Sequence, residues 1–220
     1  NFGTGDFTVD FYARFNNFNG PMMLLSKEVN ATDYYKFGVS YNSNADHLCL
    51  FLGTSPGGTC RSWDPSLNQW YHLAFVRSGS NVYLFVDGVR LGDPGVDSED
   101  ADSTASLRIG ATPHGSQIFD GYLDELRISK GIARDFSQGV PTQEYTTDSY
   151  TKLLLHMNGE NGSSRFEDSS LFTRPAFARE GQVTGAIDRD SRLTRYAYEY
   201  DTSGNQIGTY QFIPNAAGGG

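Results

Sequence analysis

Hydrophobic and polar residues alternate with a period of two through most of the first 145 residues. In "DFTVDFYARF" (6–15), one face of an extended chain would carry Phe7, Val9, Phe11, Ala13 and Phe15. The alternation returns in "YYKFGVSY", "HLCLFL" and "WYHLAFVRSGSNVYLFVDGVRL", and helical periodicity is almost absent. Many short strands separated by turn signals predict an all-β protein built as an antiparallel β-sandwich.

Turn residues place the strands of the longest stretch. Residues 70–91 predict a three-stranded meander, with Ser-Gly-Ser-Asn at the first turn and Asp87-Gly88 at the second. Residues 92–105 have five acidic residues and no apolar period, so we expect a loop there. Strands are expected again within 106–111 and 119–129.

The composition of the chain changes near residue 140, where a polar, Pro-containing segment follows the alternating strands. We expect a β-sandwich domain over 1–140, a polar, Pro-containing linker over 141–150 and a β-rich C-terminal extension over 151–220. The extension would hold one strand in "TKLLLHM" and a hairpin in "YAYEYDTSGNQIGTYQF", and it either completes this domain or begins a following module. Because the chain begins with Asn1, we expect a removed leader or a piece of a longer protein.

The charge and hydropathy of the chain exclude some classes of binding partner. The net charge is −9 and the basic residues are scattered, which argues against binding to nucleic acid. The longest apolar runs are far too short to cross a bilayer, so we expect no membrane insertion.

The two cysteines, Cys49 and Cys60, flank a turn signal. If "LCLFL" and "TCRSW" pair around that turn, the two side chains lie opposite each other, where a cross-strand disulfide can form. The alternatives are a bridge, which suits an oxidising compartment, and a reduced pair.

Four stretches occur in a fixed order: "FGTGDFTVDFYARF", "NQWYHLAFVRSGSNVYLFVDGVRLG", "LRIGA" and "FDGYLDELRISKGIAR". Together they resemble the laminin-G-like, concanavalin A-like jelly-roll family over residues 1–135. The resemblance implies two curved antiparallel sheets packed face to face. The same stretches also resemble tandem modules of phage, virus and bacterial surface proteins, and this resemblance implies an extracellular, cell-surface or virion location.

Asp124 and Glu125 are adjacent in "YLDELRI". Regular strand alternation would turn them to opposite faces, with Asp124 beside Leu126 and Ile128. They could not then flank one glycosidic bond, and the E-x-D-x-x-E run typical of glucanases of this fold is missing. Glu125 would form an exposed pair with Arg127, and catalysis is disfavoured.

Asp124 has two open interpretations: it accepts backbone N–H groups and fixes a loop, or it binds Ca²⁺, as relatives of this fold often do near such a position. A second Ca²⁺ candidate is the acidic loop, with Asp97, Asp100 and Asp102, although its spacing lacks the pattern of a dedicated calcium loop and favours a solvated loop instead. The four histidines show no zinc-type spacing.

Loop aromatics are candidates for sugar stacking. Trp63 lies in a polar segment, and we expect it to contact a ligand together with Arg61 and Asp64, or else to cover the end of the sandwich. Tyr34 and His114 are further loop candidates. The resemblance implies that Trp70 is packed in the core.

These observations favour a non-enzymatic structural or interaction module of a larger extracellular or virion assembly, such as a fibre, decoration or surface protein. Its partners would be glycan, neighbouring protein subunits or both. The alternative is a calcium-assisted, lectin-like carbohydrate-binding module. A glycoside hydrolase ranks third.

Overall fold

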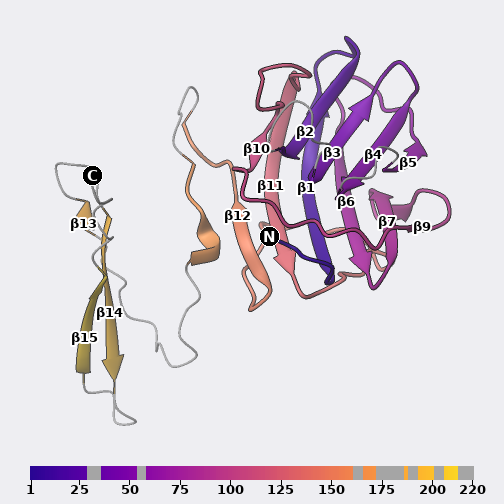
Figure 1. The fold of residues 1–220 in the computed structure, drawn as a ribbon. Coiled ribbons are helices and arrows are strands. Elements are labelled where there is room, and N and C mark those ends of the chain that lie inside the picture. The colour runs from indigo at the N-terminus through magenta and orange to yellow at the C-terminus, as the bar shows by residue number, and fades with distance from the viewer. Residues whose placement is uncertain are drawn as a thin grey trace. The chain divides into compact units, whose positions relative to one another are not determined.

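The computed structural model describes residues 1–28, 36–53, 58–160 and 166–171, and the backbone of the strands at 186–187, 193–200 and 206–212. The chain divides into two compact units, Asn1–Phe172 and Thr173–Gly220. The first unit contains two antiparallel sheets (Figure 1), which confirms the predicted all-β sandwich.

The larger sheet has seven strands. Its order is β12 (Thr151–Leu155), β11 (Gly121–Lys130), β1 (Phe7–Phe15), β6 (Trp70–Ser78), β7 (Asn81–Val86) and β8 (Val89–Arg90), and β9 (Gly95–Val96) also pairs with β7. The smaller sheet has the order β10 (Arg108–Ile109), β2 (Pro21–Lys27), β3 (Phe37–Asn42), β4 (His47–Leu52) and β5 (Thr59–Ser62). The predicted meander is β6, β7 and β8.

The core lies between the two sheets and follows the period-two pattern. The five alternating apolar residues of β1, from Phe7 to Phe15, are fully buried in one cluster with residues of β3 and β4 such as Val39 and Leu50. Burying each such side chain contributes about 1.5–3 kcal/mol. Alternation therefore fixes which face of each long strand turns inward.

The acidic loop, residues 92–105, is attached to the larger sheet by Arg77. Arg77 on β6 is fully buried and donates to the backbone carbonyls of Gly3, Gly5 and Glu99. Burial lowers the pKa of Arg77, and the charges of Asp97 and Asp100 act in the opposite direction. The expectation of a loop without strands was incomplete, because β9 forms within it.

Residues 131–150, which we call the outer crossing, lie on the side of the larger sheet that faces away from the core. Ala133 and Phe136 pack on β6 and β7, and Gly139 and Val140 reach the β7–β8 turn at Gly88. The Tyr12 hydroxyl of β1 donates to the Pro141 carbonyl. The chain then returns to β12, which pairs with β11. Residues 141–155 thus belong to the first unit, which extends past the boundary expected at residue 140.

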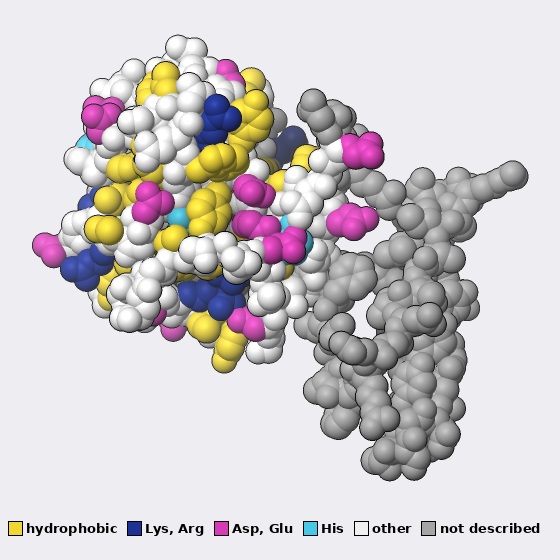
Figure 2. Space-filling model, turned by 180° about the vertical axis from the view of Figure 1, so that it is seen from behind, with side chains coloured by type: hydrophobic (Ala, Val, Ile, Leu, Met, Phe, Trp, Pro, Cys, Tyr) yellow, Lys and Arg dark blue, Asp and Glu magenta, His cyan; other side chains and the backbone are white. Residues whose placement is uncertain are grey.

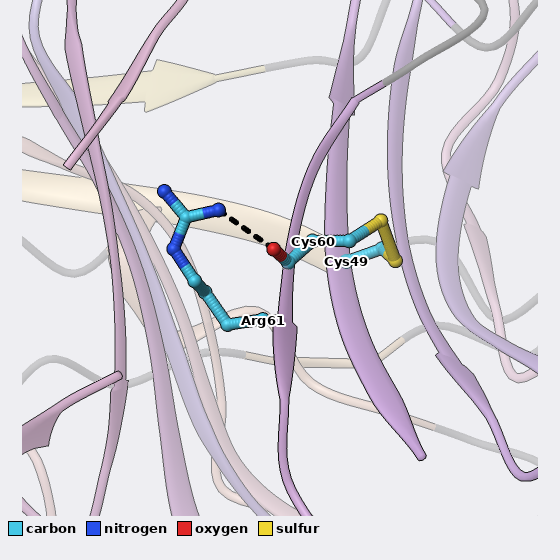
Figure 3. Close-up of a disulfide and its surroundings, with 3 residues drawn as sticks. All are labelled: Cys49, Cys60 and Arg61. Atoms are coloured by element: carbon cyan, nitrogen blue, oxygen red, sulfur yellow. Dashed lines mark hydrogen bonds between the residues drawn. A yellow bond between two sulfur atoms is a disulfide. The ribbon is translucent and has the colours of Figure 1, made fainter. Parts of the chain in front are cut away.

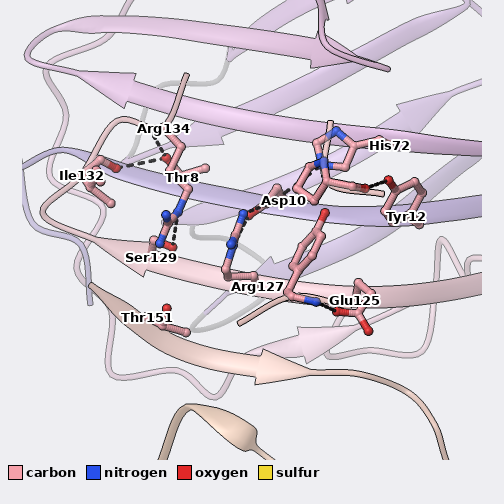
Figure 4. Close-up of polar contacts among 12 residues, drawn as sticks. Thr8, Asp10, Tyr12, His72, Glu125, Arg127, Ser129, Ile132, Arg134 and Thr151 are labelled. Carbon is pink, nitrogen blue, oxygen red and sulfur yellow. Dashed lines mark hydrogen bonds and ion pairs between the residues drawn. The ribbon is translucent and has the colours of Figure 1, made fainter. Parts of the chain in front are cut away.

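A buried polar network lies between β1, β6 and β11 on this outer face (Figure 4). Asp10 is fully buried, and its two carboxylate oxygens accept from Arg127 at 3.0 and 2.7 Å. The Nε2 atom of His72 lies 3.6 Å from Asp10. The Arg127 guanidinium in turn lies 4.3 Å from the ring centre of Tyr145, in the outer crossing.

Cys49 on β4 faces Cys60 on β5 and the two are joined by a disulfide, so the bridged alternative is the one found (Figure 3). Arg61 donates to the Cys60 carbonyl at 2.7 Å and to the Asp93 carbonyl at 3.0 Å. The bridge therefore fixes the edge of the smaller sheet.

The second unit contains the predicted hairpin. It is formed by β14 (Leu193–Tyr200) and β15 (Gln206–Phe212), with β13 (Ala186–Ile187) pairing with β14. Across the described parts of both units, no helix is long and apolar enough to cross a membrane.

Candidate functional site

A bulge in β11 breaks the expected alternation at the two adjacent carboxylates. Asp10 pairs with Arg127 and Tyr12 pairs with Asp124, so between these pairs one residue on β1 faces two on β11. Glu125 is the extra residue, with φ of +52°. The predicted opposite orientation of Asp124 and Glu125 was wrong, because the bulge shifts the phase of the strand and brings both side chains to the same depression.

This depression is open and has a volume of about 510 Å³. Its lining comes from β1, β6, β11, the outer crossing and the segment after β12, namely Tyr12, Trp70, Asp124, Glu125, Pro141, Thr142, Gln143, Glu144 and Asn158. Figure 2 shows acidic side chains gathered beside hydrophobic ones on one face of this unit. The lining therefore combines aromatic surface, amides and carboxylates.

One exposed aromatic ring, that of Trp70, lines the depression, and a second, that of Tyr122, lies next to Trp70. Trp70, at the start of β6, is 44% exposed, and Tyr122, near the start of β11, is 53% exposed. Their ring centres are 6.4 Å apart, and the Arg14 guanidinium lies 5.2 Å from the Tyr122 ring centre. The expectation that Trp70 is packed in the core was wrong, because Tyr71 and Leu73 turn inward and the alternation sends Trp70 outward.

Trp63 takes the packed position instead. Its ring contacts Phe15, Tyr41 and Tyr71 edge-on, with centres 5.1–5.9 Å apart, and it packs against the core. Of the two alternatives for Trp63, the structure shows the one in which it covers the sandwich. The reason is that its ring fills the space beside the aromatic end of β1.

Glu125 is held by contacts from two other segments. Its Oε2 atom accepts the Tyr145 backbone N–H at 2.8 Å, and the Nδ1 atom of His156 lies 2.9 and 3.0 Å from its two oxygens. His156 Nδ1 is also 3.6 Å from Glu144 Oε1, which accepts from Asn158 at 2.7 Å. The predicted exposed pair of Glu125 with Arg127 was wrong: both are buried, and Arg127 binds Asp10.

Asp124 adds a further negative charge to the depression. Its Oδ1 atom accepts the backbone N–H of Glu125 at 3.0 Å. Burial, followed by the negative charge of Glu125, raises the pKa of Asp124 above its ordinary value. The depression is therefore a region of negative potential.

The other predicted site residues lie elsewhere. Arg61, Trp63, Asp64 and His114 do not line the depression, and Tyr34 lies outside the described residues. Asp64 and His114 are exposed. Ligand binding by these residues stays a prediction.

The acidic loop uses its carboxylates locally. Asp97, Asp100 and Asp102 accept the backbone N–H groups of Glu99, Asp102 and Gly3 at 2.9, 2.9 and 2.6 Å. Within the described residues, the one group of three metal-type side chains is Glu125, Glu144 and His156, whose donor atoms lie within 4.8 Å of one another. Ca²⁺ binding by the loop or by Asp124 stays a prediction.

Sequence reasoning missed the group because its members come from three segments. Glu144 lies in the stretch expected to be a linker, and His156 lies in the strand expected in "TKLLLHM". No spacing motif links them to Glu125, so only the bulge, the outer crossing and the β11–β12 pairing bring them together.

Comparisons with known proteins agree with this architecture. In solved structures, the fold is similar to a putative carbohydrate-binding protein from Bacteroides ovatus (TM-score 0.55, 15% identity, 97% of this chain and 55% of that chain). It is also similar to a heptameric SAP-like pentraxin from Limulus polyphemus (TM-score 0.50, 17% identity, 60% of this chain and 67% of that chain). This chain thus spans about half the length of the first protein.

A search of curated proteins found no match. Residues 1–134, more than half of the chain, match the laminin G family described as the concanavalin A-like lectin/glucanases superfamily. The chain therefore belongs to the concanavalin A-like lectin/glucanase superfamily, through a laminin G-type domain at its N-terminal end.

Proposed function

We propose that this protein is a non-catalytic, extracellular glycan-binding module and that its binding site is the depression beside Trp70. The observation that carries the proposal is the pair of exposed rings, Trp70 and Tyr122, next to hydrogen-bonding side chains. A sugar ring can lay its apolar face on an aromatic ring while its hydroxyl groups bind nearby amides and carboxylates. Gln143, Asn158 and Asp124 provide such groups here.

The charge of the depression sets the class of glycan. Asp124, Glu125 and Glu144 all line it, and the excess of negative charge repels carboxylated or sulfated sugars. Neutral hexoses and amino sugars meet no such penalty. We therefore expect neutral or cationic glycans to bind and acidic ones to be rejected.

Membership of the lectin/glucanase superfamily and the fold shared with a putative carbohydrate-binding protein support this function. The disulfide supports an extracellular location, because such bridges persist in oxidising compartments. Nothing in the comparisons supports the expected place in a virion or tail fibre. A role beside neighbouring subunits of a larger surface assembly is part of the proposal.

A glycoside hydrolase is the second candidate, because three carboxylates of the described residues line one depression. The raised pKa of Asp124 is the shift that a general acid needs. Against this candidate, Glu125 is buried and already accepts from Tyr145 and His156, which leaves it poorly placed as a nucleophile. Binding without hydrolysis is therefore the function the site supports best.

A glycan array tests the proposal, with neutral, amino and acidic glycans on one surface. Trp70→Ala and Tyr122→Ala should each weaken binding about twofold to tenfold, since aromatic stacking is worth about 0.5–1.5 kcal/mol beyond area burial. Phe166→Ala is the matched control, because Phe166 is 61% exposed and does not line the depression.

Loss of binding in Phe166→Ala but not in Trp70→Ala would overturn the site assignment, and preference for acidic glycans would overturn the charge argument. The bound glycans are then incubated with the protein and analysed by chromatography. Cleavage that Glu144→Gln abolishes would replace binding with hydrolysis as the function.

A further inference from the structure

We infer that Glu125, Glu144 and His156 form a binding site for a divalent cation of the transition-metal class, with Zn²⁺ as the best match, and not for Ca²⁺. We call these three residues the metal trio. The inference concerns the acidic side of the same depression and rests on different observations from the proposed glycan binding. It also differs from the calcium sites expected at Asp124 and in the acidic loop.

Geometry is the first argument. The trio comes from the β11 bulge, the outer crossing and the residue after β12, yet its donor atoms lie within 4.8 Å of one another. Ligands of one ion that each bind at about 2.0–2.2 Å are separated by less than that distance. Small rotations of Glu144, whose side chain is 60% exposed, would complete the convergence.

Charge is the second argument. Among the ion pairs of the described residues, Glu125 and Glu144 have no cationic partner other than His156. Asp124 lines the same depression as Glu125 and Glu144. Three carboxylates next to one imidazole leave an excess of negative charge that a divalent cation would neutralise.

Support around the trio is the third argument. The Tyr145 backbone N–H, which is buried, holds one oxygen of Glu125, and the Asn158 amide holds Glu144. Outer partners of this kind orient metal ligands and tune their affinity. The open depression on the other side leaves room for water at the remaining coordination positions, as in zinc sites with three protein ligands.

The donor types decide the class of metal. Ca²⁺ takes six to eight oxygen ligands, whereas the trio provides two carboxylates and an imidazole nitrogen. Imidazole suits Zn²⁺, Co²⁺, Ni²⁺ and Cu²⁺, and carboxylates complete such sites.

The test uses the full chain, stripped with EDTA and desalted, and titrated by calorimetry with ZnCl₂ and separately with CaCl₂ at pH 7. We expect one Zn²⁺ per chain and no Ca²⁺ binding that depends on the trio. Co²⁺ should give visible absorption bands of a low-coordinate nitrogen and oxygen site. Glu144→Gln and His156→Ala should each raise the dissociation constant for Zn²⁺ by about 10-fold to 100-fold.

Two controls keep the outcome decisive. His114→Ala removes an exposed histidine outside the trio and should leave Zn²⁺ binding unchanged. Glu144→Gln changes a largely exposed side chain, so it is informative even if His156→Ala impairs folding. Absence of stoichiometric Zn²⁺ binding, binding that survives both trio variants, or loss of binding in His114→Ala would overturn the proposal. Tighter binding of Ca²⁺ at the trio would overturn the class of metal.

Discussion

Asp10 is the position where a one-residue change should cost the most stability. It is fully buried on β1 and holds the guanidinium of Arg127 with both oxygens. Burial alone lowers the pKa of Arg127, and the hydrogen bonds and charge of Asp10 more than offset that effect, so the pKa is raised. Because a guanidinium keeps its proton in proteins, Asp10 is the group that compensates the buried charge of Arg127.

Asp10→Asn removes the negative charge and leaves Arg127 buried without compensation. Breaking one side of a buried ion pair costs about 3–5 kcal/mol, a large part of the roughly 5–15 kcal/mol by which domains are stable. We expect guanidinium chloride unfolding at pH 7, followed by circular dichroism, to show a loss in that range. The control Asp93→Asn, at an exposed carboxylate, should change stability by no more than about 0.5 kcal/mol.

The double variant Asp10→Leu with Arg127→Met tests the cause. It removes both charges together, so no uncompensated group remains and the loss should be smaller than in Asp10→Asn alone. A loss below about 1 kcal/mol in Asp10→Asn would show that Arg127 does not depend on this partner. A double variant less stable than the single one would show that shape, not charge, dominates the network.

Three further changes test other parts of the structure. Replacing Cys49 and Cys60 with Ser removes the disulfide that closes a loop with a sequence separation of 11. The free energy of unfolding should fall by about 3 kcal/mol in the same assay, because the unfolded chain gains conformational entropy. A loss smaller than the one caused by reducing the disulfide of the wild-type protein would contradict this cause. Asp124→Asn should stabilise the protein at pH 7, because the raised pKa means that folding disfavours the charged form. The gain should fade as the pH drops and vanish below the ordinary value of 3.8, whereas a pH-independent gain would refute this cause. Gly121→Ala would put a Cβ 2.2 Å from a backbone carbonyl oxygen of β1 and should lower the melting temperature. In the control Gly5→Ala the nearest atom would be 3.7 Å from the new Cβ, so the melting temperature should not fall. Equal melting temperatures of the two variants would contradict the close packing of Gly121 against β1.

Much of the fold follows from local patterns in the sequence. The alternation from Phe7 to Phe15 identified the inward face of β1, because one face of a strand must be apolar wherever it covers a core. The Asp87-Gly88 dipeptide marked the β7–β8 turn, and the tyrosine-rich repeat near the C-terminus marked the β14–β15 hairpin. Each of these signals lies within a few residues of the structure it predicts.

The failures lie where the outcome depends on distant contacts. The bulge at Glu125 cannot be read from "YLDELRI", because the extra residue is defined by pairing with β1, more than 100 residues away. Trp70 was assigned to the wrong environment and Trp63 was left with two alternatives, because a polar neighbourhood in sequence says little about which ring fills a gap at the end of the sandwich. The strand phase of Trp70 relative to Tyr71 was a usable signal for its exposure.

The candidate site was the least predictable part. The rings and carboxylates that line it come from β1, β6, β11, the outer crossing and the segment after β12. Pro and polar residues in 141–150 are typical of a linker, but Tyr145 in that stretch is buried over Arg127. A large aromatic residue inside an otherwise polar segment was the one hint that the segment packs on the domain.

The outer crossing also determines how this module would hold on to a surface. Because residues 131–150 lie over β6, β7 and β1, they cover part of the outer face of the larger sheet, along which a polysaccharide strand could otherwise lie. On this sheet a bound glycan would then contact mainly the rings beside the depression, an arrangement that suits a chain end or a branch point and would give weak binding per module. Firm attachment would then come from avidity, with many copies engaged at once, and its strength would depend on how many modules the parent assembly displays and how far apart it holds them.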